Sequence, residues 1–424
     1  MGRTISNIIR NKATRKKILF TFAVLVLYRL GCSLTIPGID TTLLSLQIRN
    51  TTLLGIMNLM GGGALERMSI FALGVGPYIT AGIIIQLLSM DVIPYLTEQT
   101  KNGQKGKTKI EKITRYLALV MAILQALTMT IGFDKQYNLM MDKSFSNYVL
   151  VTAILVAGTQ ALVWLGDQIS EKGLGNGISM MIFAGIVSNI PQNFREVFNV
   201  LITGTEGSTG GIVSFIVYCV VYILIIFGVI IVQLAVRKVP VMHSTGINPK
   251  TGNKSSYLPI KVNSAGVLPV IFASSVISAP QIILSFINQE AYLKVSDFLS
   301  LTKPVGLIIY AILTFALTFF YADVQLDAEQ ISKDFSKQNS YIPKVRPGKD
   351  TQDYLSGVIH RVTLFGAIGL LILALLPFLT AMFTDIPQSA ALGGTGIIIV
   401  VGVAIETMEQ LRVQGTSQRY EGLF

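Results

Sequence analysis

Residues 61–88 read GGGALERMSIFALGVGPYITAGIIIQLL. From residue 69 onward this is an apolar run of about 20 residues, the length at which a helix crosses the hydrocarbon core of a bilayer. A shorter apolar stretch, residues 53–69, precedes it and carries three consecutive glycines. That stretch is too short and too rich in glycine to span a bilayer. It predicts a half-inserted segment on the outer side that is buried against protein and could plug a cavity, with an interfacial loop as the alternative.

Apolar runs of similar length recur and predict ten membrane spans in an all-α integral membrane protein. They cover residues 18–36, 69–89, 116–133, 148–166, 177–194, 212–235, 264–287, 304–322, 362–383 and 393–411. The composition agrees, because 51% of the 424 residues are hydrophobic and 13% are charged, about half the charged share of a soluble domain. Composition therefore excludes a soluble enzyme, a disordered chain and a disulfide framework.

The basic residues are distributed unevenly between the two sides of these spans. Of the 34 Lys and Arg residues, 26 lie on the side of the N-terminus, seven lie on the other side, and Arg29 lies within the first span. Cytoplasmic loops carry the excess of positive charge, so both termini are expected in the cytoplasm. The first run is long and lacks a small-residue cleavage site, which indicates an uncleaved span.

The ten spans divide into two sets of five, separated by a junction near residues 190–212. An odd number of spans per half gives related halves opposite orientations, which is typical of inverted repeats. We expect an N-terminal half over residues 1–190, including the segment 53–69. The C-terminal half is expected over residues 191–424, with cytoplasmic loops at about 236–263 and 323–361.

The chain lacks the motifs of common catalytic and cofactor sites. It has no phosphate-binding loop, no H-E-x-x-H and no G-x-S-x-G, and Cys32 and Cys219 have no metal-ligand spacing. The glycine-rich residues 173–177 follow a span and favour a tight loop over a nucleotide cradle. We therefore expect no catalytic activity, no metal and no cofactor.

Ionisable residues are rare inside the predicted spans. Arg29 and Glu406 are the main exceptions, and both lie toward span ends, where snorkelling to the interface explains them. The embedded polar residues are neutral and usually bond to neighbouring helices; they include Thr80, Gln86, Gln125, Gln160 and Ser274. The lack of buried charge disfavours an ion-coupled pump or transporter.

Five long motifs follow one another along the chain. They are the stretch at 61–88, WLGDQISEKGLGNGISMMIFAGIVSNIP (164–191), YLPIKVNSAGVLPVIFASSVISAP (257–280), YIPKVRPGKDT (341–351) and LGGTGIIIVVGVAIETMEQL (392–411). With these motifs the chain resembles the SecY family of protein-conducting channels over nearly its whole length. The resemblance implies two inverted five-helix halves around an hourglass pore, a plug on the outer side and a lateral gate toward lipid.

The resemblance also assigns residues to four sites. The pore ring would be formed by Val75, Ile79, Ile182, Ile271 and Ile399, with Ile178 as a neighbouring candidate. The plug would be formed by residues 53–69, including Leu54, Met57, Leu59, Gly61, Gly62, Gly63, Leu65 and Arg67. The lateral gate includes Thr80, Gln86, Gln125, Ser274 and Ser275, and the docking loops carry Arg237, Lys238, Lys250, Lys254, Lys344, Arg346 and Lys349. Taken alone, the aliphatic residues indicate ordinary helix packing, and the basic loops indicate topology or lipid contact.

A further set of expectations concerns function and partners. The resemblance implies a passive channel that passes unfolded secretory polypeptides across the bacterial cytoplasmic membrane and releases membrane segments into lipid. The SecA ATPase or the ribosome would supply the energy, and basic loops suit ribosomal phosphates. Small SecE-like and SecG-like subunits, signal-sequence-bearing polypeptides and anionic lipids are the other implied partners.

Some features depart from the family pattern. Residues 324–327 read VQLD where the family commonly has an Asn-Pro pair, and the 236–263 loop is less basic than in many members. These departures leave an accessory paralogue open beside a general channel. Two other classes are a secondary transporter, for which a polar midplane pocket would be the sign, and an insertion scaffold without an aqueous pore.

Overall fold

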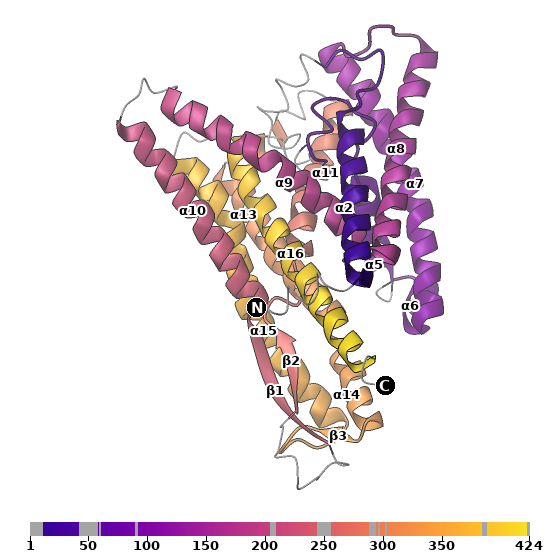
Figure 1. Ribbon diagram of the computed structural model, residues 1–424, viewed down its shortest axis with the longest axis vertical. Helices are drawn as coiled ribbons and strands as arrows, with labels where there is room; N and C mark the ends of the chain where they lie inside the picture. Colours follow the sequence, from indigo (N-terminus) through magenta and orange to yellow (C-terminus); the bar gives the residue numbers. More distant parts are fainter. Residues whose placement is uncertain are drawn as a thin grey trace. The chain divides into compact units, whose positions relative to one another are not determined.

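The computed structural model describes residues 12–41, 58, 61–89, 92–203, 209–243, 256–287, 294–295, 297–301, 303–383 and 388–421. Helices dominate this part of the chain, and a three-stranded sheet accompanies them (Figure 1). The expectation of an all-α protein is therefore wrong at that sheet. Five of the predicted site residues lie outside the described residues, namely Leu54, Met57, Leu59, Lys250 and Lys254.

A helix lies in each of the ten apolar runs. These helices are α2 (Lys12–Ser33), α5 (Gly76–Leu88), α7 (Gly103–Tyr137), α8 (Phe145–Lys172), α9 (Gly177–Phe198), α10 (Thr209–Leu234), α11 (Leu268–Ile287), α13 (Pro304–Gln325), α15 (Lys349–Phe383) and α16 (Gln388–Glu421). Shorter elements are α6 (Pro94–Lys101), the π-helix η1 (Asn199–Thr203), α14 (Ala328–Lys337) and strands β1 (Val236–His243), β2 (Ser256–Lys261) and β3 (Ser340–Tyr341).

Several of these segments meet the requirements for crossing a membrane. In the described residues, five are long and apolar enough, namely Lys105–Lys135, Phe145–Lys172, Gly211–Leu234, Pro304–Lys337 and Lys349–Leu379. The helix Gly76–Leu88 is apolar but shorter. These segments support a multi-pass membrane protein, and the count of ten spans stays a prediction.

The chain forms two compact units. The first comprises residues 1–215, 278–296 and 384–424, and the second comprises residues 216–277 and 297–383. The first unit contains segments of both predicted halves, residues 1–190 and 191–424, and the second unit lies within the latter half. The inverted symmetry of those halves stays a prediction.

In the first unit, α7 packs against α5 and α8 (Figure 1). Part of its hydrophobic core lies where α7 and α8 meet the segment between α2 and α5. Leu65 and Met68 of that segment are buried against Phe133 of α7 and Leu155 of α8. The segment that precedes α5 is therefore part of the core of this unit.

The second predicted span begins later as a helix than its hydrophobicity suggests. The apolar run starts at residue 69, but turns occupy residues 61–75 and α5 begins at Gly76. Gly74 has a φ angle of +58°, which does not continue a helix, and Pro77 in the first turn of α5 favours helix initiation there. Hydropathy detects burial in both parts and does not separate turns from helix.

The glycine-rich residues 173–177 form the tight connection between α8 and α9. Asn176 caps α9, because its side chain accepts hydrogen bonds from the backbone N–H groups of Ile178 and Ser179. A Cβ atom at Gly177 would lie 1.9 Å from the carbonyl oxygen of Gly166. Glycine is therefore required here so that two helices can approach closely, as a tight loop demands.

The second unit contains the sheet, whose strand order is β2-β1-β3 with antiparallel pairs. Along β1, Val239 and Val241 are buried, whereas Lys238 and Pro240 are exposed. This alternation is typical of a strand that covers a core on one face. Together with Ile260, Ile342, Leu355 and Ile359, Val239 forms the core beneath the sheet. Segments predicted as two cytoplasmic loops thus fold into one body with α14 and the start of α15.

The sequence VQLD at residues 324–327 has a defined role in this body. Asp327 caps α14, because its carboxylate accepts hydrogen bonds from the backbone N–H groups of Glu329 and Gln330. Leu326 packs against the core beneath the sheet. This departure from the family pattern therefore ends α13 and starts α14.

Candidate functional site

The described part of the predicted plug, residues 61–69, is a compact series of turns. The backbone N–H of Ser69 donates to the carbonyl oxygen of Ala64 at 2.9 Å, and the N–H of Gly63 donates to that of Asn58 at 2.8 Å. Ala64 and Leu65 are fully buried. We call residues 61–69 the plug turn. It has the property expected of irregular backbone inside a membrane protein, which is burial against protein.

The plug turn lies between α2 and α9. Gly62 and Gly63 have φ angles of +70° and +80°, a region that favours glycine. A Cβ atom at Gly62 would lie 3.0 Å from the Cα of Gly185 on α9 and 3.0 Å from the hydroxyl oxygen of Tyr28 on α2. The glycines therefore permit both the turn and its close approach to the two helices.

Polar contacts also join the plug turn to α2 and the residues that follow it. A guanidinium nitrogen of Arg29, Nη1, donates to the carbonyl oxygen of Gly62. The Sγ atom of Cys32 donates to the carbonyl oxygen of Gly61 at 3.7 Å. Farther along, the backbone N–H of Ile36 donates to the carbonyl oxygen of Met68 at 3.1 Å.

The sequence did not predict which residues of α2 and α9 contact the plug turn. They are Tyr28, Arg29 and Cys32 of α2 and Gly185 and Asn189 of α9. The available signal was Arg29, a charged residue in an apolar run. We interpreted it as snorkelling, but its guanidinium binds a backbone carbonyl in the structure.

Five of the six predicted ring residues lie in the first unit. Val75 precedes α5, Ile79 lies in its first turn, Ile178 and Ile182 begin α9, and Ile399 lies in α16. Val75, Ile182 and Ile399 are buried within the chain. Ile271, also buried, belongs to α11 in the second unit. Convergence of Val75, Ile79, Ile182, Ile271 and Ile399 at one pore height, with Ile178 as a neighbour, stays a prediction.

Helices α9 and α16, which carry three of the predicted ring residues, pack against each other. A Cβ atom at Gly396 would lie 2.8 Å from Ile186, and the hydroxyl group of Thr407 donates to the sulfur of Met180 at 3.6 Å. The two helices therefore run antiparallel. Because Ile399 lies between Gly396 and Thr407, it lies beside the stretch of α9 between Ile186 and Met180, which contains Ile182.

The residues assigned to the lateral gate form bonds within their own helices. The hydroxyl group of Thr80 donates to the carbonyl oxygen of Gly76 at 3.1 Å, and that of Ser274 donates to the carbonyl oxygen of Ile271 at 2.7 Å. Gln86 and Gln125 are half-buried. Ser275 lies in α11, and its side chain is outside the described part. The gate assignment therefore stays a prediction.

The described docking residues lie on the folded body of the second unit. Arg237 and Lys238 are exposed on β1, and Lys344, Arg346 and Lys349 are exposed between β3 and the start of α15. The Nζ atom of Lys238 lies 4.8 Å from the ring centroid of Tyr257, a cation–π contact across β1 and β2. These cations are thus carried by a packed sheet-and-helix body.

The loop that carries Arg346 is anchored through its backbone. The hydroxyl group of Thr351 donates to the carbonyl oxygen of Arg346 at 2.7 Å, and that of Ser332 donates to the carbonyl oxygen of Gly348 at 2.8 Å. Thr351 is buried, whereas the side chain of Arg346 is exposed. The structure therefore fixes the position of Arg346 while leaving its guanidinium accessible.

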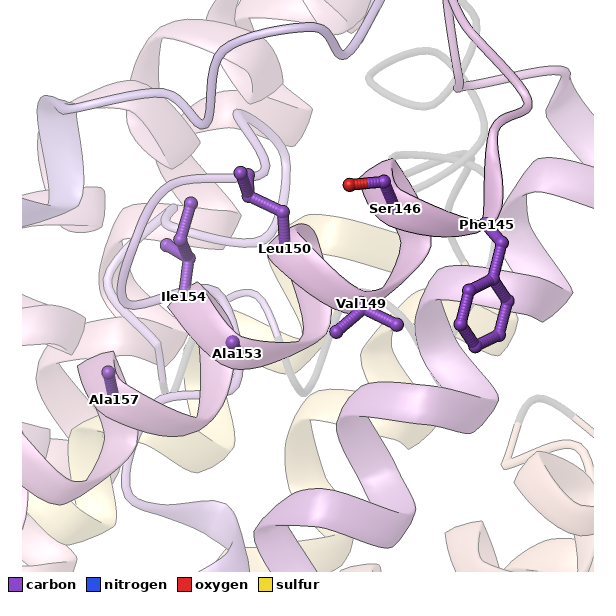
Figure 2. Close-up of a pocket in the computed structure, with 7 residues that line it drawn as sticks. All are labelled: Phe145, Ser146, Val149, Leu150, Ala153, Ile154 and Ala157. Atoms are coloured by element: carbon purple, nitrogen blue, oxygen red, sulfur yellow. The ribbon is translucent and has the colours of Figure 1, made fainter.

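A hollow of about 640 Å³ lies along α8 (Figure 2). Its lining residues all come from that helix and are almost entirely apolar; they are Phe145, Ser146, Val149, Leu150, Ala153, Ile154 and Ala157. Such a lining suits a lipid chain or an apolar helix. Among the described residues, no three His, Cys, Asp or Glu side chains are grouped to hold a metal ion.

Comparisons with known proteins give one consistent result. A family model described as SecY matches residues 69–408. The protein translocase subunit SecY of Bacillus subtilis (strain 168) is 42% identical over 428 residues, with 100% of this chain and 99% of that protein covered. The same subunit of Staphylococcus aureus (strain NCTC 8325 / PS 47) is 38% identical over 426 residues, with the same coverage.

Solved structures share the fold at lower sequence identity. A protein-conducting channel matches with a TM-score of 0.67 and 20% identity over 94% of this chain and 91% of that chain. Sec61 in the canine ribosome-channel complex matches with a TM-score of 0.66, 20% identity and the same coverage. The yeast Ssh1 complex bound to the 80S ribosome matches with a TM-score of 0.61 and 16% identity over 93% and 89% of the two chains.

Proposed function

The chain belongs to the SecY family of protein translocase subunits, and we propose that it forms the pore through which unfolded secretory polypeptides cross a bacterial cytoplasmic membrane. It is a protein-conducting channel. It does not itself supply the energy for transport, which comes from partners. In the proposal, membrane-protein segments leave the same pore sideways into lipid.

The observation that supports the pore most directly is the plug turn. Residues 61–69 are irregular backbone buried between two helices of an apolar chain. Such backbone is stable at membrane depth where protein surrounds it or where it lines a cavity. In our proposal the plug turn closes the outer side of the pore at rest and leaves when a polypeptide enters.

The ring would close the waist of the pore. Narrow apolar constrictions lose water and so resist ion flow, yet aliphatic side chains can move aside for a passing chain. The packing of α16, which carries Ile399, against the part of α9 that contains Ile182 supports a ring of this kind. In the proposal Val75, Ile79 and Ile271 complete it, with Ile178 as a neighbour.

The folded body formed by β1, β2, β3, α14 and the start of α15 would dock the motor. Exposed Arg237, Lys238 and Arg346 suit acidic protein surfaces or ribosomal phosphates. Two of the similar solved structures are bound to ribosomes. For this chain we propose the SecA ATPase or the translating ribosome as the motor.

The remaining partners follow from the same proposal. Small single-span subunits similar to SecE and SecG, signal-sequence-bearing polypeptides and anionic lipids would contact the chain in a bacterial cytoplasmic membrane. Both termini would lie in the cytoplasm, as the 26-to-7 distribution of basic residues predicts. Polar residues on α5, α7 and α11 would line the lateral gate.

Crosslinking to an arrested polypeptide tests this function. A photoreactive amino acid is placed at Ile182 or Ile399, and a secretory polypeptide is halted midway by a folded domain at its end. Both positions should crosslink to the arrested chain, because a polypeptide in the pore must pass the waist. The controls are Ile223 and Ile231 of α10, which are 56% and 65% exposed on the chain. Equal crosslinking at all four positions would contradict the ring and the proposed path.

A further inference from the structure

The contact between Arg29 and the plug turn carries an inference that goes beyond the ring and the plug themselves. Arg29 lies near the end of α2, in the apolar sequence LVLYRLGCS. A charged side chain in such a helix is costly unless its charge reaches water or a hydrogen-bonding partner. The structure shows a partner within the protein, since Nη1 of Arg29 donates to the carbonyl oxygen of Gly62.

Donors from α2 supplement the backbone hydrogen bonds of the plug turn at Gly61 and Gly62. Residues 61–63 form no helix or strand, and within the turn the carbonyl oxygen of Gly61 accepts a hydrogen bond from the backbone N–H of Ala64 at 3.4 Å. A buried carbonyl without a donor is unfavourable. Arg29 donates to Gly62, and Cys32, one turn farther along α2, donates to Gly61 at 3.7 Å. One face of α2 thus holds two consecutive carbonyl groups.

The groups around Gly62 allow the Arg29 contact only when the plug turn lies between α2 and α9. Tyr28 is 2% exposed, and its hydroxyl oxygen lies 3.0 Å from the place of a Cβ atom at Gly62. Gly185 approaches Gly62 from α9 just as closely. The Gly62 carbonyl meets the guanidinium only when the turn fits between these groups, so displacement of the plug turn breaks the bond.

We propose that Arg29 is the latch of the plug: its guanidinium holds the Gly62 carbonyl in the closed channel, and breaking this bond is part of the free-energy cost of opening. This inference rests on the proposed role of residues 61–69 as a plug. Arg29 is thereby a positioning residue for gating. A charged donor binds a carbonyl more strongly than a neutral one does, so this single bond has a large effect on a small segment.

The test uses the native Cys32 as a reporter. Cys32 is 3% exposed beneath the plug turn, so a water-soluble thiol reagent should reach it when the turn has left. Cys219, the other free cysteine, is replaced by serine. The complex with its small membrane subunits is reconstituted in liposomes, and both the rate of Cys32 modification and the resting ion leak are measured.

Arg29→Met removes the donor and keeps a long side chain. We expect Cys32 to react about tenfold faster in this variant, with a raised leak, because loss of a hydrogen bond from a charged donor changes an equilibrium by about that factor. Arg29→Lys keeps a cationic donor and should restore part of the protection. Arg195→Met, at an exposed arginine of α9 six residues beyond Asn189, should leave both measurements unchanged.

Two outcomes would overturn the latch. One is Cys32 modification and leak in Arg29→Met that equal those of the parent. The other is equal loss of protection in Arg29→Met and Arg29→Lys, with less protein in the membrane, which would show that Arg29 is required for folding. Deletion of residues 61–67 distinguishes failure of the latch at Arg29 from failure of the proposed plug. A leak in the deletion without one in Arg29→Met rejects the latch alone, whereas an unchanged leak in the deletion rejects the plug.

Discussion

Gly62 illustrates at the scale of one residue why the plug turn has its sequence. Its φ angle of +70° is unfavourable for other residues, and its neighbours on α2 and α9 leave no room for a side chain. The three glycines at 61–63 correctly predicted a break in the helix. They could not predict Tyr28 and Gly185 as neighbours, because these contacts join residues far apart in the sequence.

Gly62→Ala should therefore loosen the plug turn. A left-handed conformation costs about 1–2 kcal/mol for a residue other than glycine, and the contacts of 3.0 Å with Gly185 and Tyr28 add to this cost. We expect a higher resting ion leak in reconstituted liposomes, with unchanged protein abundance in the membrane. The matched control is Gly82→Ala in α5, where no heavy atom lies within 4 Å of the added Cβ atom. Identical leak in the two variants would contradict the tight fit at Gly62.

At the scale of elements, the helices were more predictable than the sheet. Each helix in the apolar runs carries enough hydrophobic residues in sequence to be recognised from composition alone. Strands β1 and β2 contain Arg237, Lys238 and Lys261, and their charge led to a prediction of loops. The alternation at Val239 and Val241 is short, and its meaning depends on Ile342 and Leu355, which lie about a hundred residues farther along the chain.

The folded body of the sheet, α14 and the start of α15 carries Arg346, whose charge can be reversed to test docking. Arg346→Glu should impair motor-dependent translocation while the amount of folded channel stays constant. The reason is that Thr351 holds the backbone of Arg346, whereas its side chain is exposed. Translocation into inverted membrane vesicles at several salt concentrations measures this effect, which should be larger at low salt because electrostatic attraction is screened by ions.

Lys143→Glu is the matched charge reversal for this experiment. Lys143 is exposed but lies on the predicted outer side of the membrane, where a cytoplasmic motor does not bind. The Lys143→Glu channel should therefore translocate polypeptides at the parental rate. Parental translocation by Arg346→Glu as well would remove Arg346 from the docking surface, and reduced abundance of that variant would indicate a structural role instead.

At the scale of the whole molecule, the sequence predicts family and function better than it predicts the working parts. Long motifs in a fixed order identify a protein-conducting channel, because they are spread along the chain and so report the fold as a whole. The latch at Arg29 is different. It depends on one side chain that meets one carbonyl oxygen 33 positions away, and no local pattern records such a contact. Three-dimensional packing is needed to reveal it.

The orientation of the chain is the remaining whole-molecule property that can be tested directly. The 26-to-7 distribution of basic residues predicts that both termini and the folded body of β1, β2, β3, α14 and the start of α15 lie in the cytoplasm. In a chain without Cys32 and Cys219, Lys143→Cys should react with a membrane-impermeant maleimide in intact cells whose outer barrier is open. Lys344→Cys should react only after the cytoplasmic membrane is permeabilised. Both lysines are exposed on the chain, so a difference in labelling reports the side of the membrane and not burial. Labelling of Lys344→Cys in intact cells would show that the orientation is opposite to the predicted one. The folded body would then lie outside the cytoplasm, where no cytoplasmic motor can reach it.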